Sequence, residues 1–248
     1  MNILVCKNYT ITDHTKWYND RTNETGLVEN YTAMEELCVA SAKKYVKDLD
    51  EVKVFRGEAD NIRDVFKINF YEIYDLWQQG NNILYVDLDV IFINNAEYFN
   101  QFDKFAMFNF TDPSSTTDSH YDITLPQFFN CGIRYYPSSM DQSIWDKGIA
   151  MVENWNPDRW DCEQVIYNAM MWDQALELGN VYNPPLAFQM LASDMEDAMN
   201  TNFNHIHISE AKAIHLHGSR DSFSRLQVME KLSRLEIPAK PTEEYIYL

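Results

Sequence analysis

The stretch NILYVDLDVIF, residues 82–92, predicts the central strand of the fold. Its apolar run leads to Asp87 and Asp89 and resumes directly after them. Because side chains alternate along a strand, both aspartates are expected on one face. Two carboxylates crowded at the end of a buried strand repel each other unless a positive charge lies between them. A divalent metal with oxygen ligands would relieve this repulsion. The alternative is two solvated aspartates that cap the strand.

The composition indicates a globular protein that neither binds nucleic acid nor spans a membrane. The 248 residues suffice for one domain with a full core, and the 46% hydrophobic content argues against disorder. The net charge of −18 argues against nucleic acid or an anionic membrane as partner, because both require a basic surface. No apolar segment approaches the length of a membrane span, and residues 1–6 are too short for a signal-peptide core. The scattered cysteines form no CxxC pair. We therefore expect a reduced, cytoplasmic protein.

Strands and helices are expected to alternate along the chain, since short apolar runs alternate with segments of helical periodicity. The expected strands are 3–6, 52–55, 83–92, 105–110, 128–135 and 213–217, and the expected helices are 32–46, 62–77, 139–154, 162–178 and 222–235. Gly57 is expected to end the second strand and Gly80 the second helix, whereas residues 8–30 lack clear periodicity and suggest a loop. This alternation predicts an α/β domain with a mainly parallel sheet. Ligands of such sheets bind beyond the carboxyl ends of the strands, where Asp87 and Asp89 are expected.

A second group of polar residues lies in AIHLHGSR, residues 213–220. Alternation places His215 and His217 on the same face of the expected strand. A histidine at a strand end, followed by a glycine and Arg220, could complete a metal site and present a cation to a phosphate. Either histidine could be the ligand, and a hydrogen-bonded core histidine is the alternative.

A third group is QFFNCGI, residues 127–133, in which Asn130 and Gly132 interrupt an apolar run. This pattern indicates backbone brought close to a ligand, or simply a bulge. A basic residue, Lys67, lies on the helix before the central strand and off its apolar stripe, a position that is usually solvated.

A fourth group is WDCEQ, residues 160–164, which opens an apolar helix. Asp161 could be the N-cap, with Gln164 completing a variant of the capping box. In the functional interpretation, Glu163 or Asp161 faces a reacting centre.

Together these stretches resemble the metal-dependent glycosyltransferases of the GT-A fold, most closely the retaining families of glycogenin, bacterial lipopolysaccharide galactosyltransferases and plant xyloglucan xylosyltransferases. Those families have a basic helix residue, then Asp-x-Asp at a strand end, Asn-x-Gly, an acidic residue followed by Gln, and His-x-x-Gly. The matching residues here are Lys67, Asp87-Leu88-Asp89, Asn130-Cys131-Gly132, Glu163-Gln164 and His215-Leu216-His217-Gly218. Three departures stand out. The first strand lacks a clear nucleotide-base signature, although Lys7, Asn8 and Tyr9 stand at the expected place. The acidic residue is Glu163, unless Asp161 is the counterpart, and the lysine expected after His-x-x-Gly is absent, with Arg220 as its expected substitute.

The resemblance implies a Rossmann-like GT-A domain over residues 1–248, with a mixed, mainly parallel sheet flanked by helices. Residues 1–110 would form the nucleotide-binding half, which ends just after the Asp-x-Asp motif. Residues 111–237 would bind the acceptor and complete the metal site, and residues 238–248 would form a tail.

The resemblance also implies transfer of a sugar, expected to be a hexose, from a nucleotide-diphosphate sugar such as a UDP-sugar to an unidentified carbohydrate or other acceptor, with retention. Mn²⁺ or Mg²⁺ would be held by Asp87, Asp89 and His215. The residues expected at the donor are Lys7, Tyr9, Lys67, Asp87, Gly218 and Arg220, and those expected in the reaction are Asn130, Asp161, Glu163 and Gln164. Within these sets, Tyr9 could stack on the base, and Asn130 and Gln164 could hold sugar hydroxyls.

Two other functions stay open. A haloacid-dehalogenase-like, Mg²⁺-dependent phosphohydrolase also has an apolar strand that ends in Asp-x-Asp. Its motif usually opens the domain and is followed by Thr or Gly, whereas here a long segment precedes the motif and Val90 follows it. The other function is a non-catalytic carbohydrate-binding protein on the same scaffold.

Overall fold

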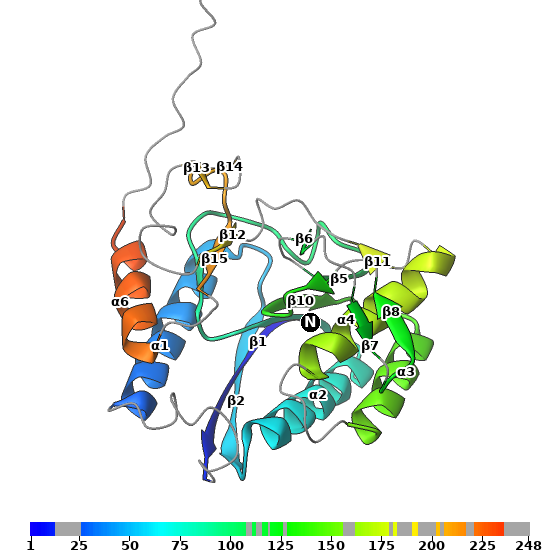
Figure 1. Cartoon of the computed structure of the whole chain (residues 1–248). Coiled ribbons are helices and arrows are strands. Elements are labelled where there is room, and N and C mark those ends of the chain that lie inside the picture. Colours follow the sequence, from blue (N-terminus) through cyan, green and yellow to red (C-terminus); the bar gives the residue numbers. More distant parts are fainter. Residues whose placement is uncertain are drawn as a thin grey trace, which may run out of the picture.

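The computed structural model of the chain describes residues 1–12, 26–107, 111–112, 116–118, 120–125, 128–155, 162–178, 181–182, 190–192, 202–203, 206–216 and 221–235. Within these residues, helices cover both faces of a central six-stranded sheet (Figure 1). This arrangement agrees with the predicted α/β domain.

The central sheet is mixed and mainly parallel, as predicted. Its strands are β1 (Asn2–Ile11), β2 (Glu51–Ala59), β3 (Asn82–Val86), β5 (Phe105–Met107), β10 (Ile133–Tyr136) and β11 (Val181–Tyr182). They lie in the order β11-β5-β10-β3-β1-β2. Strand β1 pairs in parallel with β2 and β3, and β11 pairs in parallel with β5. Strand β10 runs antiparallel to both β3 and β5.

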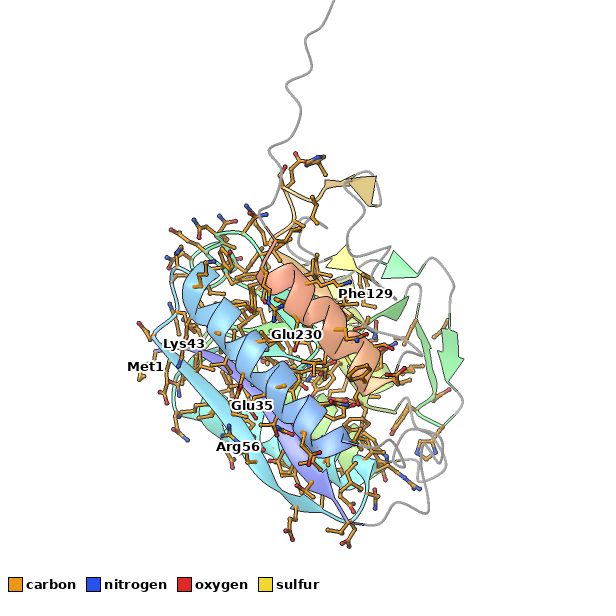
Figure 2. The ribbon with its side chains drawn as sticks, turned by 90° about the vertical axis from the view of Figure 1, so that its left-hand side faces the viewer. Met1, Glu35, Lys43, Arg56, Phe129 and Glu230 are labelled. Carbon is orange, nitrogen blue, oxygen red and sulfur yellow. The ribbon has the colours of Figure 1, made fainter. Side chains whose placement is uncertain are left out.

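The helices divide between the two faces of the sheet (Figure 1). Helices α1 (Leu27–Tyr45) and α6 (Ser222–Ser233) cover one face, and α2 (Ile62–Gln78), α3 (Gln142–Glu153) and α4 (Cys162–Leu178) cover the other. Alternation along β1 sends Leu4 and Cys6 into the core beneath α1 and α6, and Ile3 and Val5 into the core beneath α2, α3 and α4. Figure 2 shows α1 and α6 lying side by side on their face.

Local chemistry determines where the helices begin and end. The side chain of Asn61 accepts hydrogen bonds from the backbone N–H groups of Arg63 and Asp64 and caps α2. The same helix is followed by Gly80, which has a φ of +80° that favours glycine. The predicted helix over residues 62–77 is therefore confirmed, together with its glycine stop.

The predicted central strand over residues 83–92 is wrong as a single element. Strand β3 ends at Val86, and a turn follows in which the N–H of Val90 donates to the carbonyl of Asp87 at 3.1 Å. The chain then enters a second sheet as β4 (Val90–Phe92), which pairs antiparallel with β15 (Ala213–His215). In turn, β15 pairs in parallel with β12 (Met190–Leu191). The turn is hidden in the sequence because both strands that flank it are apolar.

The predicted strand over residues 128–135 is also divided. It consists of β9 (Phe128–Phe129) and β10, and residues 130–132 lie between them. Strand β2 runs through Gly57, which therefore does not end it. In the segment predicted as a loop, β1 continues to Ile11 and α1 already begins at Leu27, while residues 13–25 lie outside the described part. The predicted tail, residues 238–248, lies outside it as well.

The remaining strands form short two-stranded pairs. Strand β6 (Thr111–Asp112) pairs with β9, β7 (Thr116–Asp118) with β8 (Ile123–Leu125), and β13 (Asn202–Phe203) with β14 (Ile206–His207). Across the residues that the structure describes, none of the helices is both long and apolar enough to cross a membrane.

Candidate metal centre and active site

Asp87, Asp89 and His215 converge at the carboxyl end of β3. The two aspartates lie in the turn after β3, and His215 is the last residue of β15, opposite Val90 of β4. One potential ligand atom of each residue lies within 4.8 Å of those of the other two. The Nε2 of His215 is 3.2 Å from Oδ1 of Asp89 and 3.8 Å from Oδ2 of Asp87. Two carboxylates and one imidazole are suitable ligands for a divalent metal. We call these three residues the acidic cluster.

The acidic cluster is buried except on one side. The side chains of His215 and Asp89 are 3% and 9% exposed, whereas that of Asp87 is 34% exposed. Backbone hydrogen bonds hold both aspartates in place, because the N–H of Asp87 donates to the carbonyl of Gly132 at 2.8 Å and the N–H of Leu216 donates to the carbonyl of Asp89 at 2.9 Å. A ligand can therefore approach a site whose backbone is already held.

Gly132 lies directly against the imidazole of His215. A Cβ atom at this position would be 2.0 Å from Cε1 of His215, a distance that real Cβ atoms do not show. The N–H of Gly132 donates to Oδ1 of Asn130 at 2.8 Å, so these two residues form a local turn. The sequence predicted backbone close to a ligand at this point. In the structure that backbone is close to His215.

The second oxygen of each aspartate is bound by a residue outside the cluster. The hydroxyl of Tyr85 donates to Oδ1 of Asp87 at 2.7 Å. Arg225 of α6 donates through Nη1 to Oδ2 of Asp89 at 2.7 Å and through Nη2 to the hydroxyl of Tyr31 at 3.2 Å. The remaining oxygens, Oδ2 of Asp87 and Oδ1 of Asp89, face His215.

Neighbouring charges shift the pKa values within the acidic cluster. Burial disfavours the charged form of Asp89, but His215 and Arg225 hold the pKa of this carboxyl well below its usual range. Burial also disfavours protonated His215, yet the carboxylates of Asp89 and Asp87 raise the pKa of the imidazole above its ordinary value. Without a metal, Asp89 is therefore anionic at neutral pH and His215 keeps its proton to a higher pH than a free histidine does.

A second group of charges lies beside the acidic cluster. The Nζ of Lys7 is 3.1 Å and 3.3 Å from the two carboxylate oxygens of Glu163, and the Nη1 of Arg134 is 3.4 Å from Oε1 of the same residue. Lys7 also lies 4.4 Å from the centre of the Phe66 ring. We call Lys7, Arg134 and Glu163 the basic cluster. It contains two cations and one carboxylate.

Tyr85 joins the two clusters. Its hydroxyl binds Asp87, its ring lies 4.0 Å from the guanidinium carbon of Arg134, and Lys7 lies 5.4 Å from the same ring. Arg134 contacts Tyr167 on its other side at 3.7 Å, so its guanidinium lies between two aromatic rings.

The other predicted site residues are placed as follows. Gln164 follows Glu163 in the first turn of α4 and is half-buried. Tyr9 donates its hydroxyl to Glu72 of α2. Neither cluster includes Lys67, which is half-buried on α2. Asp161, Gly218, Arg220 and the alternative ligand His217 lie outside the described residues.

Sequence reasoning missed Tyr85, Arg134 and Arg225. Arg134 interrupts the apolar run of a predicted strand, and this charge in a buried element was the one available hint. A further polar contact was also missed on the other face of β1. The carboxylate of Glu35 accepts from Nδ2 of Asn8 at 2.8 Å and pairs with Arg56. Figure 2 shows Glu35 on α1 and Arg56 on β2 next to each other.

No protein-family model matches the chain, and no curated protein matches it. Solved structures do match. A glycosyltransferase involved in glycosylation of the major capsid of PBCV-1 matches with a TM-score of 0.54 and 12% identity, over 93% of this chain and 99% of that one. The chain has a glycosyltransferase fold.

Two further structures support this fold assignment. An active-site mutant of LgtC matches with a TM-score of 0.50 and 11% identity, over 97% of this chain and 98% of that one. The WbbM bifunctional glycosyltransferase, in its apo form, matches with a TM-score of 0.52 and 9% identity, over 92% of this chain and 49% of that one. The predicted GT-A fold class is thus confirmed. At these identities the likeness concerns the fold alone.

Proposed function

We propose that the protein is a metal-dependent glycosyltransferase that moves a hexose from a nucleotide-diphosphate sugar, in the first instance a UDP-sugar, to a carbohydrate or other glycosyl acceptor. The observation that carries the proposal is the convergence of Asp87, Asp89 and His215 beyond the carboxyl end of β3, in a chain with a glycosyltransferase fold. In α/β sheets, ligands bind at that end of the strands.

The acidic cluster suits the leaving group of such a reaction. Cleavage of the sugar–phosphate bond leaves a nucleoside diphosphate on which negative charge develops. Mn²⁺ or Mg²⁺ held by Asp87, Asp89 and His215 would act as a Lewis acid towards this charge. Both aspartates belong to the half over residues 1–110, which we propose binds the nucleotide. His215 belongs to the half over residues 111–237, which we propose completes the metal site.

The basic cluster suits the transferred sugar and its phosphates. We place the carboxylate of Glu163 beside the positive charge that develops on the sugar, with Gln164 and Asn130 at the sugar hydroxyls. Lys7 lies between Glu163 and the ring of Tyr85, where its ammonium group can approach a phosphate. We also propose contacts to the donor from Lys67, Tyr9, Gly218 and Arg220. Asp161 is the alternative to Glu163. Retention of configuration is proposed from the family pattern alone.

Two alternatives give different results in simple assays. A phosphohydrolase would cleave a generic aryl phosphate in the presence of Mg²⁺, and the glycosyltransferase fold counts against it. A carbohydrate-binding protein without catalysis would bind a nucleotide sugar but would not release the nucleotide. A cytoplasmic location stays a prediction from the sequence.

The test is release of UDP from a panel of UDP-hexoses with and without Mn²⁺, for the wild type and the variant Asp89→Asn. We expect slow hydrolysis of a preferred donor that requires the metal. Asp89→Asn should reduce the rate of this hydrolysis by about 1,000-fold, since metal stabilisation of a leaving group contributes several kcal/mol. Asp141→Asn is the matched control, because Asp141 caps α3 through its bond to the N–H of Ser143, at a surface outside both clusters. Unchanged turnover by Asp89→Asn would refute the metal site.

A further inference from the structure

Tyr85 is a fully buried tyrosine with two separate tasks. Its hydroxyl donates to Oδ1 of Asp87 at 2.7 Å, and its ring packs against the guanidinium of Arg134 at 4.0 Å. The two residues are directly opposite each other on the neighbouring strands β3 and β10. Tyr85 is therefore held by the sheet itself, between a candidate metal ligand and the basic cluster.

Arg134 is an unusual residue for its position. It is fully buried, its Nη1 lies 3.4 Å from Oε1 of Glu163, and its Nε and Nη2 make no hydrogen bond to any of the residues that the structure describes. Burial of a guanidinium with unused donors is costly, and apolar residues that replace a whole buried ion pair often serve stability equally well. The contacts that Arg134 does make are to Glu163 and to the rings of Tyr85 and Tyr167. These contacts place the guanidinium where it can orient the carboxylate of Glu163.

We propose that Tyr85 and Arg134 are positioning residues for the carboxylates of Asp87 and Glu163. Tyr85 orients the metal-binding carboxylate, and Arg134 orients the carboxylate at the sugar. The inference rests on the proposed function. It goes beyond that function because neither residue needs to touch the metal, the donor or the acceptor.

The two residues should affect different steps. Among the described residues, the hydroxyl of Tyr85 donates to Asp87, so its loss should weaken metal binding. A residue that forms a hydrogen bond to a metal ligand typically contributes a factor of about 10 to 100 to the metal affinity. The guanidinium of Arg134 contacts Glu163 and not the acidic cluster, so its loss should reduce turnover at saturating metal and donor. Small displacements of a reacting group can reduce turnover by about 100-fold.

The first arm of the test is Tyr85→Phe, which keeps the ring against Arg134 and removes the hydroxyl. Mn²⁺ binding to the full chain is measured by isothermal titration calorimetry, and turnover of the preferred UDP-hexose is measured at saturating Mn²⁺. We expect Mn²⁺ affinity to fall about tenfold or more, while kcat is retained once the metal saturates. Tyr135→Phe is the matched control. Tyr135 is the buried neighbour of Arg134 on β10, and its hydroxyl donates to the carbonyl of Phe99 at 3.4 Å, on the opposite face of the sheet.

The second arm is Arg134→Met, which replaces a buried cation by an apolar side chain of similar length. We expect kcat to fall about 10- to 100-fold, while Mn²⁺ affinity stays at the wild-type value. Arg134→Lys should recover only part of kcat, since lysine keeps the charge but lacks the planar group that packs between Tyr85 and Tyr167.

The combined outcome decides the inference. Losses of Mn²⁺ affinity and kcat that move together in both variants, in step with a fall in melting temperature, would show that both residues are merely structural. If wild type binds Mn²⁺ and turns over donor while both variants behave like Tyr135→Phe, the inference alone is wrong. If wild type neither binds Mn²⁺ nor turns over any donor, the proposed function fails, and the inference fails with it.

Discussion

The acidic and basic clusters lie next to each other, and they balance charge in opposite ways. The acidic cluster has two carboxylates and an imidazole, with Arg225 as the neighbouring cation, whereas the basic cluster has two cations around the single carboxylate of Glu163. An added cation relieves repulsion in the first and increases it in the second. We therefore expect Mn²⁺ to offset the loss of a charged residue at the acidic cluster but not at the basic cluster. Substitutions at each cluster, measured as the free energy of unfolding, can test that difference.

The largest effect is expected in the basic cluster. Glu163→Gln should lower the free energy of unfolding by about 4 kcal/mol, because Lys7 and Arg134 lose the carboxylate that pairs with them in a buried site. Mn²⁺ binding should stabilise both proteins and should not narrow the difference between the variant and the wild type. Urea denaturation with and without Mn²⁺ measures both quantities. Glu230→Gln, at an exposed pair with Arg234, is the control and should change stability by less than about 1 kcal/mol. Recovery of Glu163→Gln by Mn²⁺ would remove the distinction between the clusters.

A smaller loss, partly reversed by the metal, is expected in the acidic cluster. Arg225→Met should lower the free energy of unfolding of the metal-free protein by about 3 kcal/mol, since Asp89 loses a buried cationic partner. Mn²⁺ should restore part of the loss, because it supplies positive charge to the same carboxylate. The same denaturation series tests this, with Arg234→Met at the exposed C-terminal cap of α6 as control. If the metal had no effect on the variant, the cluster would not be a cation site.

A substitution at Gly132 would change the geometry of the acidic cluster without changing its charge. Gly132→Ala should cost about 2 kcal/mol of stability, because the new Cβ atom overlaps the ring of His215. Mn²⁺ affinity should fall about 10- to 100-fold as the imidazole is displaced. Gly148→Ala is the control, since its Cβ would meet Sδ of Met170 at 2.5 Å in the core beneath α3. That control should lose stability but keep its Mn²⁺ affinity. Equal affinities in the two variants would show that the position of His215 does not matter for the metal.

The smallest effect is expected from pH. The carboxylates of Asp89 and Asp87 outweigh burial and raise the pKa of His215 above 6.5. A group with a raised pKa in the folded state stabilises the fold fully below its unfolded pKa, and this contribution is lost as pH rises through the folded pKa. The metal-free protein should therefore lose stability as pH rises above 6.5, by less than Arg225→Met or Gly132→Ala reduces it. Mn²⁺ affinity should rise over the same range, because a metal ligand must be a neutral imidazole. Calorimetric titrations at several pH values measure this, and a flat affinity would contradict it.

Local patterns in the sequence were enough for the described helices and for the longer strands of the central sheet, but the short strands β6, β7, β8, β11, β12, β13 and β14 were not predicted. The helix over residues 162–178 was predicted with both of its ends, and the helix over residues 62–77 with its glycine stop. Hydrophobic periodicity and caps are properties of neighbouring residues, so they can be recognised without the fold. The prediction failed where the apolar run 83–92 turns from one sheet into another, because burial on both sides of the turn makes the run continuous.

The candidate site divides in the same way. By itself, the sequence determined that Asp87 and Asp89 directly follow a buried apolar run, and the resemblance in motif order pointed to His215. That both aspartates lie in a turn was decided by the structure. Only the tertiary structure decided that Lys7 meets Glu163, 156 residues away, and that Arg225 meets Asp89, 136 residues away. Such contacts depend on the pairing of strands and the packing of helices. These bring together residues whose neighbours in the sequence do not indicate which distant residue they will contact.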